Sequence, residues 1–133
     1  MVAIDGSQDS LKAAEYALGV AKSFSAQLYA VTVIYESKEK SDSMNDANTW
    51  FQKFDQDAKE KNVQLKTELI NKHVSWPLVP VPIEYVLCMY AEKEKVDLIV
   101  LGTRGQSGFK KLLLGSVASG VVKYAHCPVM VVK

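Results

Sequence analysis

Apolar segments of two kinds alternate along this chain, and the alternation predicts a parallel α/β fold. Residues 28–35 and 96–101 are rich in β-branched residues and nearly all apolar, as in strands buried on both faces of a sheet. Between such segments, apolar residues such as Leu11, Ala14 and Leu18 recur at helical spacing. Right-handed crossovers between parallel strands place helices on both faces. We therefore expect a five-stranded α/β sheet with helices on either side.

The expected elements follow the order strand, helix, strand, helix, strand, helix, strand, loop, helix, strand. Residues 63–70 alternate apolar and polar side chains, which indicates a more exposed strand near a sheet edge. Residues 36–46 are polar and charged, which favours a loop. The expected strands are residues 2–4, 28–35, 63–70, 96–101 and 128–132. The expected helices begin near Asp9, carry an apolar face over residues 47–58, span residues 82–95, and begin at residues 115–116.

The length of the chain indicates a single domain, residues 1–133, and its charge and cysteine content limit the class of protein. Lys and Arg total 16 against 15 for Asp and Glu, which argues against nucleic acid or an anionic membrane as the main partner. The two cysteines lack CxxC spacing, which argues against a zinc site or a disulfide framework and favours the cytoplasm. No segment reaches the about 18 apolar residues of a membrane span, and the first residues do not resemble a signal peptide.

Polar residues follow two of the expected strands. The first strand ends in the sequence DGS at residues 5–7, and the fourth continues directly into GTRG at residues 102–105. In open α/β sheets, ligands bind outside the carboxyl ends of strands, where the strand order reverses. If these two strands are neighbours, Asp5 faces the glycine segment across a crevice.

The glycine-rich segment after the fourth strand contains the parts of a phosphate cradle. Gly102 and Gly105 allow positive φ and a close approach of backbone to a ligand, and successive amides there can form an anion nest. Ser116 is a favourable N-cap type where the last helix starts, and helix starts attract anions. Movable positive charge nearby comes from Arg104, Lys110 and Lys111.

The residues alone leave a plainer interpretation open. Glycines after a strand also form ordinary turns, and Asp5 can form an Asx turn. Neither the Walker A pattern nor a GxGxxG sequence after a strand occurs in this chain. Phosphate binding and an ordinary turn followed by a helix start are therefore both compatible with this segment.

The glycine spacing resembles that of the universal stress protein family. ATP-binding members carry a glycine, two residues, a glycine, nine residues, and then glycine followed by Ser or Thr. This chain has Gly102, two residues, Gly105, nine residues, and then Gly115 and Ser116. The resemblance extends to VAIDGS at the start, to DLIVLGTRG after the third expected helix and to LLLGSVASGVVKYAHCPVMVV at the end, and it includes most of the chain between. Family members carry several more residues before the first strand, so either this strand is short or the natural chain begins upstream.

The resemblance implies a Rossmann-like fold of the adenine nucleotide alpha hydrolase type, with sheet order 3-2-1-4-5. It implies that Asp5 lies beside the ribose and phosphates and that a backbone group at Val33 contacts adenine. The ligand would be ATP, or else ADP or AMP, with magnesium or manganese on the phosphates and no dedicated protein cage for the metal. A homodimer through the last strand, Val129–Val132, is also implied. The residues implied to line the phosphates and ribose are Gly102, Arg104, Gly105, Gly115, Ser116 and Val117.

Other chemistry-bearing residues are expected to be structural, and no catalytic residue is assigned. His73 and His126 have no identified carboxylate or nucleophile partner, and Cys88 and Cys127 are expected to be packed rather than reactive. The second helix is expected to place Trp50, Phe51 and Phe54 in the core. The last helix is expected to face the sheet with Val117, Ala118, Val121, Val122 and Ala125.

Residues 74–82 contain three prolines, which exclude a regular helix or a central strand. Trp76 in this segment is expected either to cap the sheet edge or to belong to an exposed apolar patch for a partner. The last strand is apolar and expected at a sheet edge, where exposed backbone groups pair with other strands.

Three functions are compatible with the sequence. The favoured one is an ATP-binding regulatory module of the stress response, without enzymatic activity beyond at most weak ATP hydrolysis. The second is a slow ATPase or nucleotidyl-transfer enzyme, which needs a base near the terminal phosphate; Asp5 is the one candidate. The third is a module that acts by dimerisation or partner binding without a nucleotide, since a fold does not itself guarantee a ligand.

Overall fold

A computed structural model of the chain describes residues 1–36, 41–73, 81–105 and 114–133, and within these ranges the side chains of residues 36, 41–44 and 73 are not described. Lys110, Lys111 and Trp76 lie outside the described residues. The described elements are β1 (Val2–Ala3), α1 (Gln8–Phe24), β2 (Leu28–Glu36), α2 (Ser41–Glu60), β3 (Leu65–His73), α3 (Ile83–Lys93), β4 (Ile99–Gly102), α4 (Ser116–Tyr124) and β5 (Val129–Val132).

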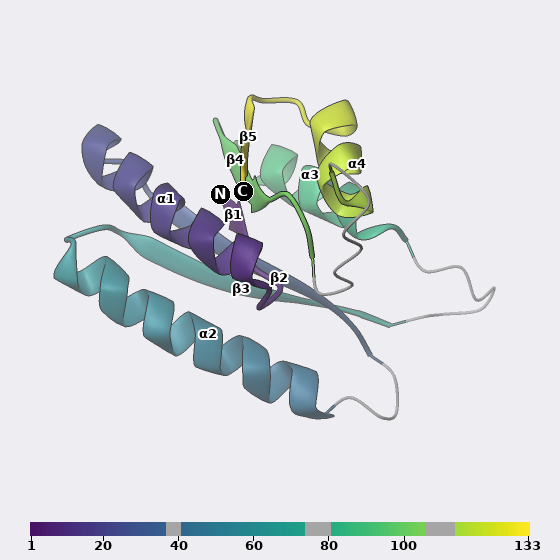
Figure 1. Ribbon diagram of the computed structural model, residues 1–133, viewed down its shortest axis with the longest axis horizontal. Helices are drawn as coiled ribbons and strands as arrows, with labels where there is room; N and C mark the ends of the chain where they lie inside the picture. The colour runs from purple at the N-terminus through teal and green to yellow at the C-terminus, as the bar shows by residue number, and fades with distance from the viewer. Residues whose placement is uncertain (37–40, 74–80, 106–113) are drawn as a thin grey trace.

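The sheet has five parallel strands in the order β3-β2-β1-β4-β5, which confirms the expected fold (Figure 1). The short strand β1 lies at the centre, where Val2 pairs with Ala30 of β2 and with Val100 of β4. The strand order reverses between β1 and β4. Strand β3 lies at one edge, as its alternating pattern predicts, and β5 lies at the other.

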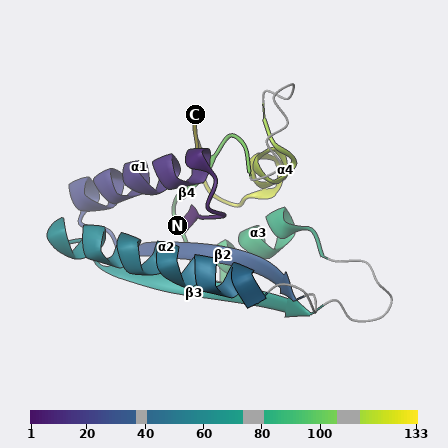
Figure 2. The same cartoon turned by 60° about the horizontal axis from the view of Figure 1, so that its bottom comes forward.

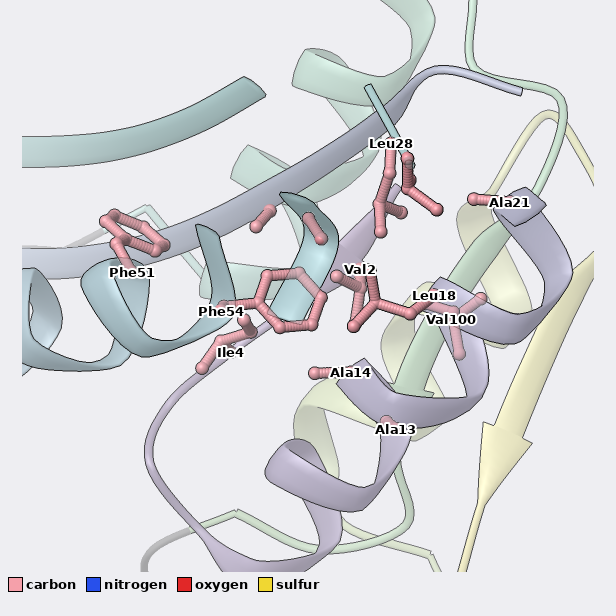
Figure 3. Packing of buried hydrophobic residues seen from close by; sticks show 14 of the residues in the cluster. Val2, Ile4, Ala13, Ala14, Leu18, Ala21, Leu28, Phe51, Phe54 and Val100 are labelled. Carbon is pink, nitrogen blue, oxygen red and sulfur yellow. The ribbon is translucent and has the colours of Figure 1, made fainter. Parts of the chain in front are cut away.

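Helices cover both faces of the sheet (Figures 1 and 2). One core cluster joins the inner faces of α1 and α2 to the sheet, and Figure 3 shows Phe54 of α2 beside Ile4, with Leu18 of α1 close to Val2. The second cluster joins α3 and α4 to the opposite face. Phe51 and Phe54 are buried and Trp50 packs against them at the edge of the first cluster, so the expected core face of α2 is confirmed.

Helix α1 has the features expected of a helix that packs closely on a sheet. Ser7 is its N-cap and accepts a hydrogen bond from the Ser10 amide, which satisfies one free donor of the first turn. Ser25 ends the helix in the left-handed conformation with φ 50°. The buried face consists mostly of small residues, which lets the helix axis approach the strands: Ser10, Ala13, Ala14, Ala17, Leu18 and Ala21.

Three expectations about the elements are wrong. Residues 41–46 belong to α2, although a loop is expected over residues 36–46, because these polar turns extend a helix that the apolar face of residues 47–58 anchors. Strand β4 begins at Ile99 instead of Val96, because the chain first leaves α3 through Lys95 with φ 53°. Val122 is 51% exposed and does not face the sheet.

None of the helices in the described part of the chain combines the length and the apolar character that a membrane span requires.

Candidate functional site

A pocket lies at the carboxyl ends of β1 and β4, where the strand order reverses. Because Val2 pairs with Val100, the turn after β1 and the glycine segment after β4 are neighbours, as the crevice hypothesis requires. The space within the pocket is about 580 Å³ when the open solvent at its mouth is included, and the centre of a water-sized group can reach about 100 Å³ of it.

Seven of the eight predicted site residues line this pocket: Asp5, Val33, Gly102, Arg104, Gly105, Gly115 and Val117. Ser116 does not line it, and its side chain is exposed. The sequence interpretation missed the apolar walls that Ile83 and Leu87 contribute from α3. Both lie on the apolar face expected for that helix, so helical spacing combined with the sheet order could have found them. The contacts of all these residues with a nucleotide stay predictions.

The turn after β1 is held by a network of short hydrogen bonds. The Ser7 hydroxyl lies 2.6 Å from Asp5 Oδ1 and 3.2 Å from the Arg104 carbonyl oxygen, and the Ser7 amide donates to the same Asp5 oxygen at 3.0 Å. The buried Ser10 hydroxyl donates to the Ser7 carbonyl at 3.0 Å and accepts from the Asp5 amide at 3.3 Å. Ser7, the N-cap of α1, therefore orients one oxygen of the Asp5 carboxylate.

Two further side-chain hydrogen bonds anchor the end of β1 and the segment after β4. The Thr32 hydroxyl, fully buried on β2, donates to the Ile4 carbonyl at 2.9 Å. The Thr103 hydroxyl donates to Asp9 Oδ2 at 2.7 Å and so ties the segment after β4 to the start of α1. These bonds join the two sides of the pocket through buried or half-buried side chains, which favours a preformed site.

Gly102 and Gly105 of the motif lack side chains for different structural reasons. A β-carbon at Gly102 would lie 2.6 Å from the backbone carbon of Asp9, so this glycine lets β4 pack against α1 rather than against a ligand. A β-carbon at Gly105 would lie 2.7 Å from Asp5 Oδ2, so the missing side chain leaves room for the carboxylate. Gly102 and Gly105 could adopt positive φ but do not use this freedom; among the described glycines, Gly6 alone has positive φ, at 80°.

The start of α4 is bare backbone. Gly115 is the N-cap, its amide donates to the Thr103 carbonyl at 2.7 Å, and as a glycine it has no side chain with which to cap the helix. The expectation that Ser116 is the N-cap is therefore wrong by one residue, because Gly115 itself takes the extended conformation with φ −67° and ψ 161°. The first amides of a helix have no intrahelical acceptor and carry the positive end of its dipole. The start of α4 thus offers donors to an anion in the pocket.

Arg104 carries a buried donor without a partner among the described residues. Its Nε is shielded from solvent and makes no hydrogen bond there, although unpaired buried donors are costly. Arginine next to uncapped helix amides matches the geometry of phosphate oxygens. The residues present therefore fit a phosphate-bearing ligand: a free guanidinium donor, free amides, and glycines without side chains to fill the space.

The remaining chemistry-bearing residues lie elsewhere. His126 lies outside the pocket and contacts the Val96 carbonyl through Nε2 at 3.1 Å. Burial raises the pKa of the Cys88 thiol and of the Cys127 thiol, which disfavours the reactive thiolate and agrees with packed cysteines. The His73 side chain lies outside the described part. Within the described residues, no group of three or more His, Cys, Asp or Glu side chains could hold a metal ion.

Comparison with known proteins relates the whole chain to one family. The model of the family described as "Universal stress protein family" matches residues 1–133. Universal stress protein MJ0531 of Methanocaldococcus jannaschii is 38% identical over 137 aligned residues, which cover 100% of this chain and 80% of the relative.

Two solved structures share the fold. The universal stress protein of Archaeoglobus fulgidus in complex with dAMP has a TM-score of 0.76 at 18% identity, covering 99% of this chain and 94% of that one. A universal stress protein family protein of Arabidopsis thaliana with AMP bound has a TM-score of 0.68 at 18% identity, covering 100% and 89%.

Proposed function

This chain belongs to the universal stress protein family, and from that premise we propose that it binds an adenine nucleotide, foremost ATP, in the pocket between β1, β4 and α4. The observation that carries the proposal is the juxtaposition of the fixed Asp5 carboxylate with uncapped amides and an unpaired arginine donor. The dAMP and AMP in the two solved relatives support an adenine nucleotide as the ligand class.

Each part of a nucleotide has a matching surface in the pocket. The phosphates would be held by Arg104 and by backbone at Gly105 and Gly115, where the lack of side chains leaves the amides accessible. The ribose hydroxyls would donate to the Asp5 carboxylate, which is an acceptor when ionised. The adenine ring would lie against the apolar wall formed by Val33, Ile83 and Leu87, and the backbone at Val33 would contact the polar edge of the ring.

A divalent cation, magnesium or manganese, would come with the phosphates. Magnesium keeps several waters and binds through substrate phosphates with one or two carboxylates. Asp5 is the carboxylate that lines the pocket and could face such an ion. The metal would neutralise phosphate charge and stabilise the bound conformation of a triphosphate.

A regulatory role fits these residues better than catalysis. A general base for hydrolysis must reach the attacking water. Asp5, the one carboxylate among the described residues that line the pocket, already accepts two hydrogen bonds from Ser7 on Oδ1. We therefore assign the chain a nucleotide-dependent role in the cytoplasmic stress response, in which occupancy biases conformation or partner choice.

The same proposal includes a homodimer through β5. Val132 accepts from the Thr103 amide on the β4 side, so strand alternation points the amides of Val129 and Val131 away from β4. An unprotected apolar edge of this kind favours antiparallel pairing with a second copy. Sedimentation equilibrium should give twice the chain mass, and Val131→Pro, which removes one outward amide, should give the monomer.

The nucleotide is tested by mass spectrometry of the small molecules released on denaturing freshly purified protein, followed by calorimetric titration with ATP, ADP and AMP. Gly115→Val should abolish measurable binding, because its β-carbon would lie 3.2 Å from the Thr103 carbonyl and its methyl groups would enter the cradle. Gly19→Val is the matched control, since nothing lies within 4 Å of a β-carbon there.

Unchanged ATP binding in Gly115→Val would refute the assignment of the phosphates to this cradle. Steady hydrolysis by the wild-type protein that disappears in Asp5→Asn, with binding retained, would replace the regulatory role by an ATPase. An absence of adenine nucleotide in both experiments would favour the third function, a partner-binding module.

A further inference from the structure

Gly6 lies directly against the indole ring of Trp50, which comes from α2. A β-carbon at Gly6 would lie 2.7 Å from Cε2 of that ring and closer still to two further ring carbons. Gly6 also has φ 80°, a conformation that residues with a side chain rarely adopt. The turn after β1 is therefore pressed between the hydrogen-bonded start of α1 and the indole of α2.

Helix α2 contributes no residue to the lining of the pocket in the described part of the chain. Helix α2 contacts the turn beside the pocket through Trp50, which lies against Gly6. Trp50 is half-buried and packs against the core cluster that contains Phe51 and Phe54, and this packing restrains its ring. Figure 2 shows the connection after β1 passing between α1 and α2.

We infer that Trp50 is a positioning residue for the nucleotide site: it supports the turn so that the Asp5 carboxylate faces Gly105. This inference rests on the proposed nucleotide binding. The hydrogen bonds from Ser7 and Ser10 hold the turn on the side of α1, and the indole of Trp50 packs against the same turn at Gly6. Without the indole, the turn loses this packing contact and can shift toward α2, taking Asp5 with it.

The location of Asp5 makes such a movement consequential. Its Oδ2 lies where a β-carbon at Gly105 would come within 2.7 Å, so the carboxylate occupies a narrow space beside the glycine segment. A small displacement of a polar group in a preformed site weakens the bonds it makes to a ligand. Trp50 therefore acts on nucleotide affinity through Asp5 and not by touching the ligand.

The test is a double-mutant cycle on the full chain, with ATP affinity measured by calorimetry in wild type, Trp50→Ala, Asp5→Asn and the double variant. Trp50→Ala should weaken ATP binding about tenfold when Asp5 is present and less than about twofold when it is combined with Asp5→Asn, as for residues in one contact network. Phe51→Leu, on the same helix but turned into the core, is the control and should keep full affinity despite lower stability.

Amide hydrogen exchange in the absence of nucleotide gives a second readout. The amides of Ser7 and Ser10 donate within the turn, and their exchange should accelerate about tenfold in Trp50→Ala but not in Phe51→Leu. Trp50→Phe, which keeps an aromatic ring and guards against a failure to fold, should restore most of the protection.

Equal loss of affinity with and without the Asp5→Asn substitution, or unchanged exchange at Ser7 and Ser10, would overturn the inference. If the wild-type protein binds no adenine nucleotide, the proposed function fails, and unchanged exchange or accelerated exchange still decides whether Trp50 supports the turn. Faster exchange together with an affinity loss confined to the proteins that retain Asp5 would establish it.

Discussion

The two chain segments that meet at the pocket are built in opposite ways. The turn after β1 is held by side chains: Ser7 and Ser10 bond to Asp5 and to each other's backbone, and Trp50 packs against Gly6. The described part of the segment after β4 and the start of α4 carries Gly105 and Gly115, the latter an N-cap without a side chain, and Arg104 Nε is unpaired among the described residues. In this part of the structure, one side of the pocket uses its hydrogen-bonding groups internally and the other presents donors without a partner.

This difference separates residues that hold the site from residues that bind. Hydrogen-bonding capacity already used within the protein stabilises the fold, whereas capacity left over is available to a ligand. All three glycines of the motif line the pocket, but a β-carbon at Gly102 would meet the backbone of α1, whereas one at Gly105 would meet the Asp5 carboxylate and one at Gly115 the Thr103 carbonyl. A motif that is continuous in sequence thus serves the fold and, under the proposed function, also the ligand site.

Gly102→Ala should have the largest effect, and on stability. Its β-carbon would meet the backbone of Asp9 and Ser10 at 2.6–2.8 Å, and backbone cannot rotate away as a flexible side chain can. We expect a loss of about 2 to 3 kcal/mol in the free energy of unfolding, typical of overpacking. Urea unfolding followed by circular dichroism measures it.

Gly19→Ala is the matched control, because the same substitution in open space on α1 should raise stability by about 0.5–1 kcal/mol. Wild-type stability in Gly102→Ala would contradict a packing role and would favour a role of this glycine in ligand binding.

Gly105→Ala should instead affect binding. The clash at 2.7 Å is with Oδ2 of Asp5, the far end of a side chain that can turn away at small cost to the fold. Displacing that carboxylate should weaken ATP binding about tenfold, or about 1.4 kcal/mol, with little change in the unfolding midpoint. Calorimetric titration beside urea unfolding separates the two effects. A large loss of stability with intact affinity would erase the distinction between Gly102 and Gly105.

Ser7→Ala tests the side of the pocket held by side chains. The substitution removes the N-cap of α1 and the 2.6 Å bond to Asp5, and it should cost about 1 kcal/mol of unfolding free energy. Ser23→Ala is the control on the same helix, since its exposed hydroxyl donates to the Gly19 carbonyl within the helix. Equal stability of the two variants in urea unfolding would show that the network around Asp5 adds nothing to the fold.

Much of the fold was predictable because local patterns suffice for it. The fully apolar segments and the helical spacing determine the strands and most helices, and the resemblance supplied the strand order. The start of α2 was missed because its first turns are polar and show no periodicity before Ala47. Helix ends of this kind depend on tertiary anchoring of the rest of the helix.

The candidate site was predictable in position and less so in mechanism. Strand ends and glycine spacing locate the pocket, but they do not reveal that Gly102 faces Asp9, because that contact joins residues 93 positions apart (102 − 9). The role of Trp50 was missed for the same reason: its apolar character predicts a core residue, and only the packing of α2 brings it to Gly6. Sequence reasoning finds residue types and spacing, whereas close approach between distant segments needs the structure.

Arg104→Met should have the smallest effect on the ligand-free protein, and that makes it informative. If Arg104 supported the fold as Ser7 does, its loss would cost a hydrogen bond, but its Nε has no partner among the described residues. An apolar side chain of similar length removes a buried unpaired donor, so the free energy of unfolding should change by about 0.5 kcal/mol or less. Urea unfolding without and with ATP provides the measurement. The stabilisation that ATP confers should fall in the variant, because binding to the folded state is what produces it. A destabilised ligand-free variant would show that Arg104 stabilises the fold, and the contrast between the two sides of the pocket would then fail for this residue.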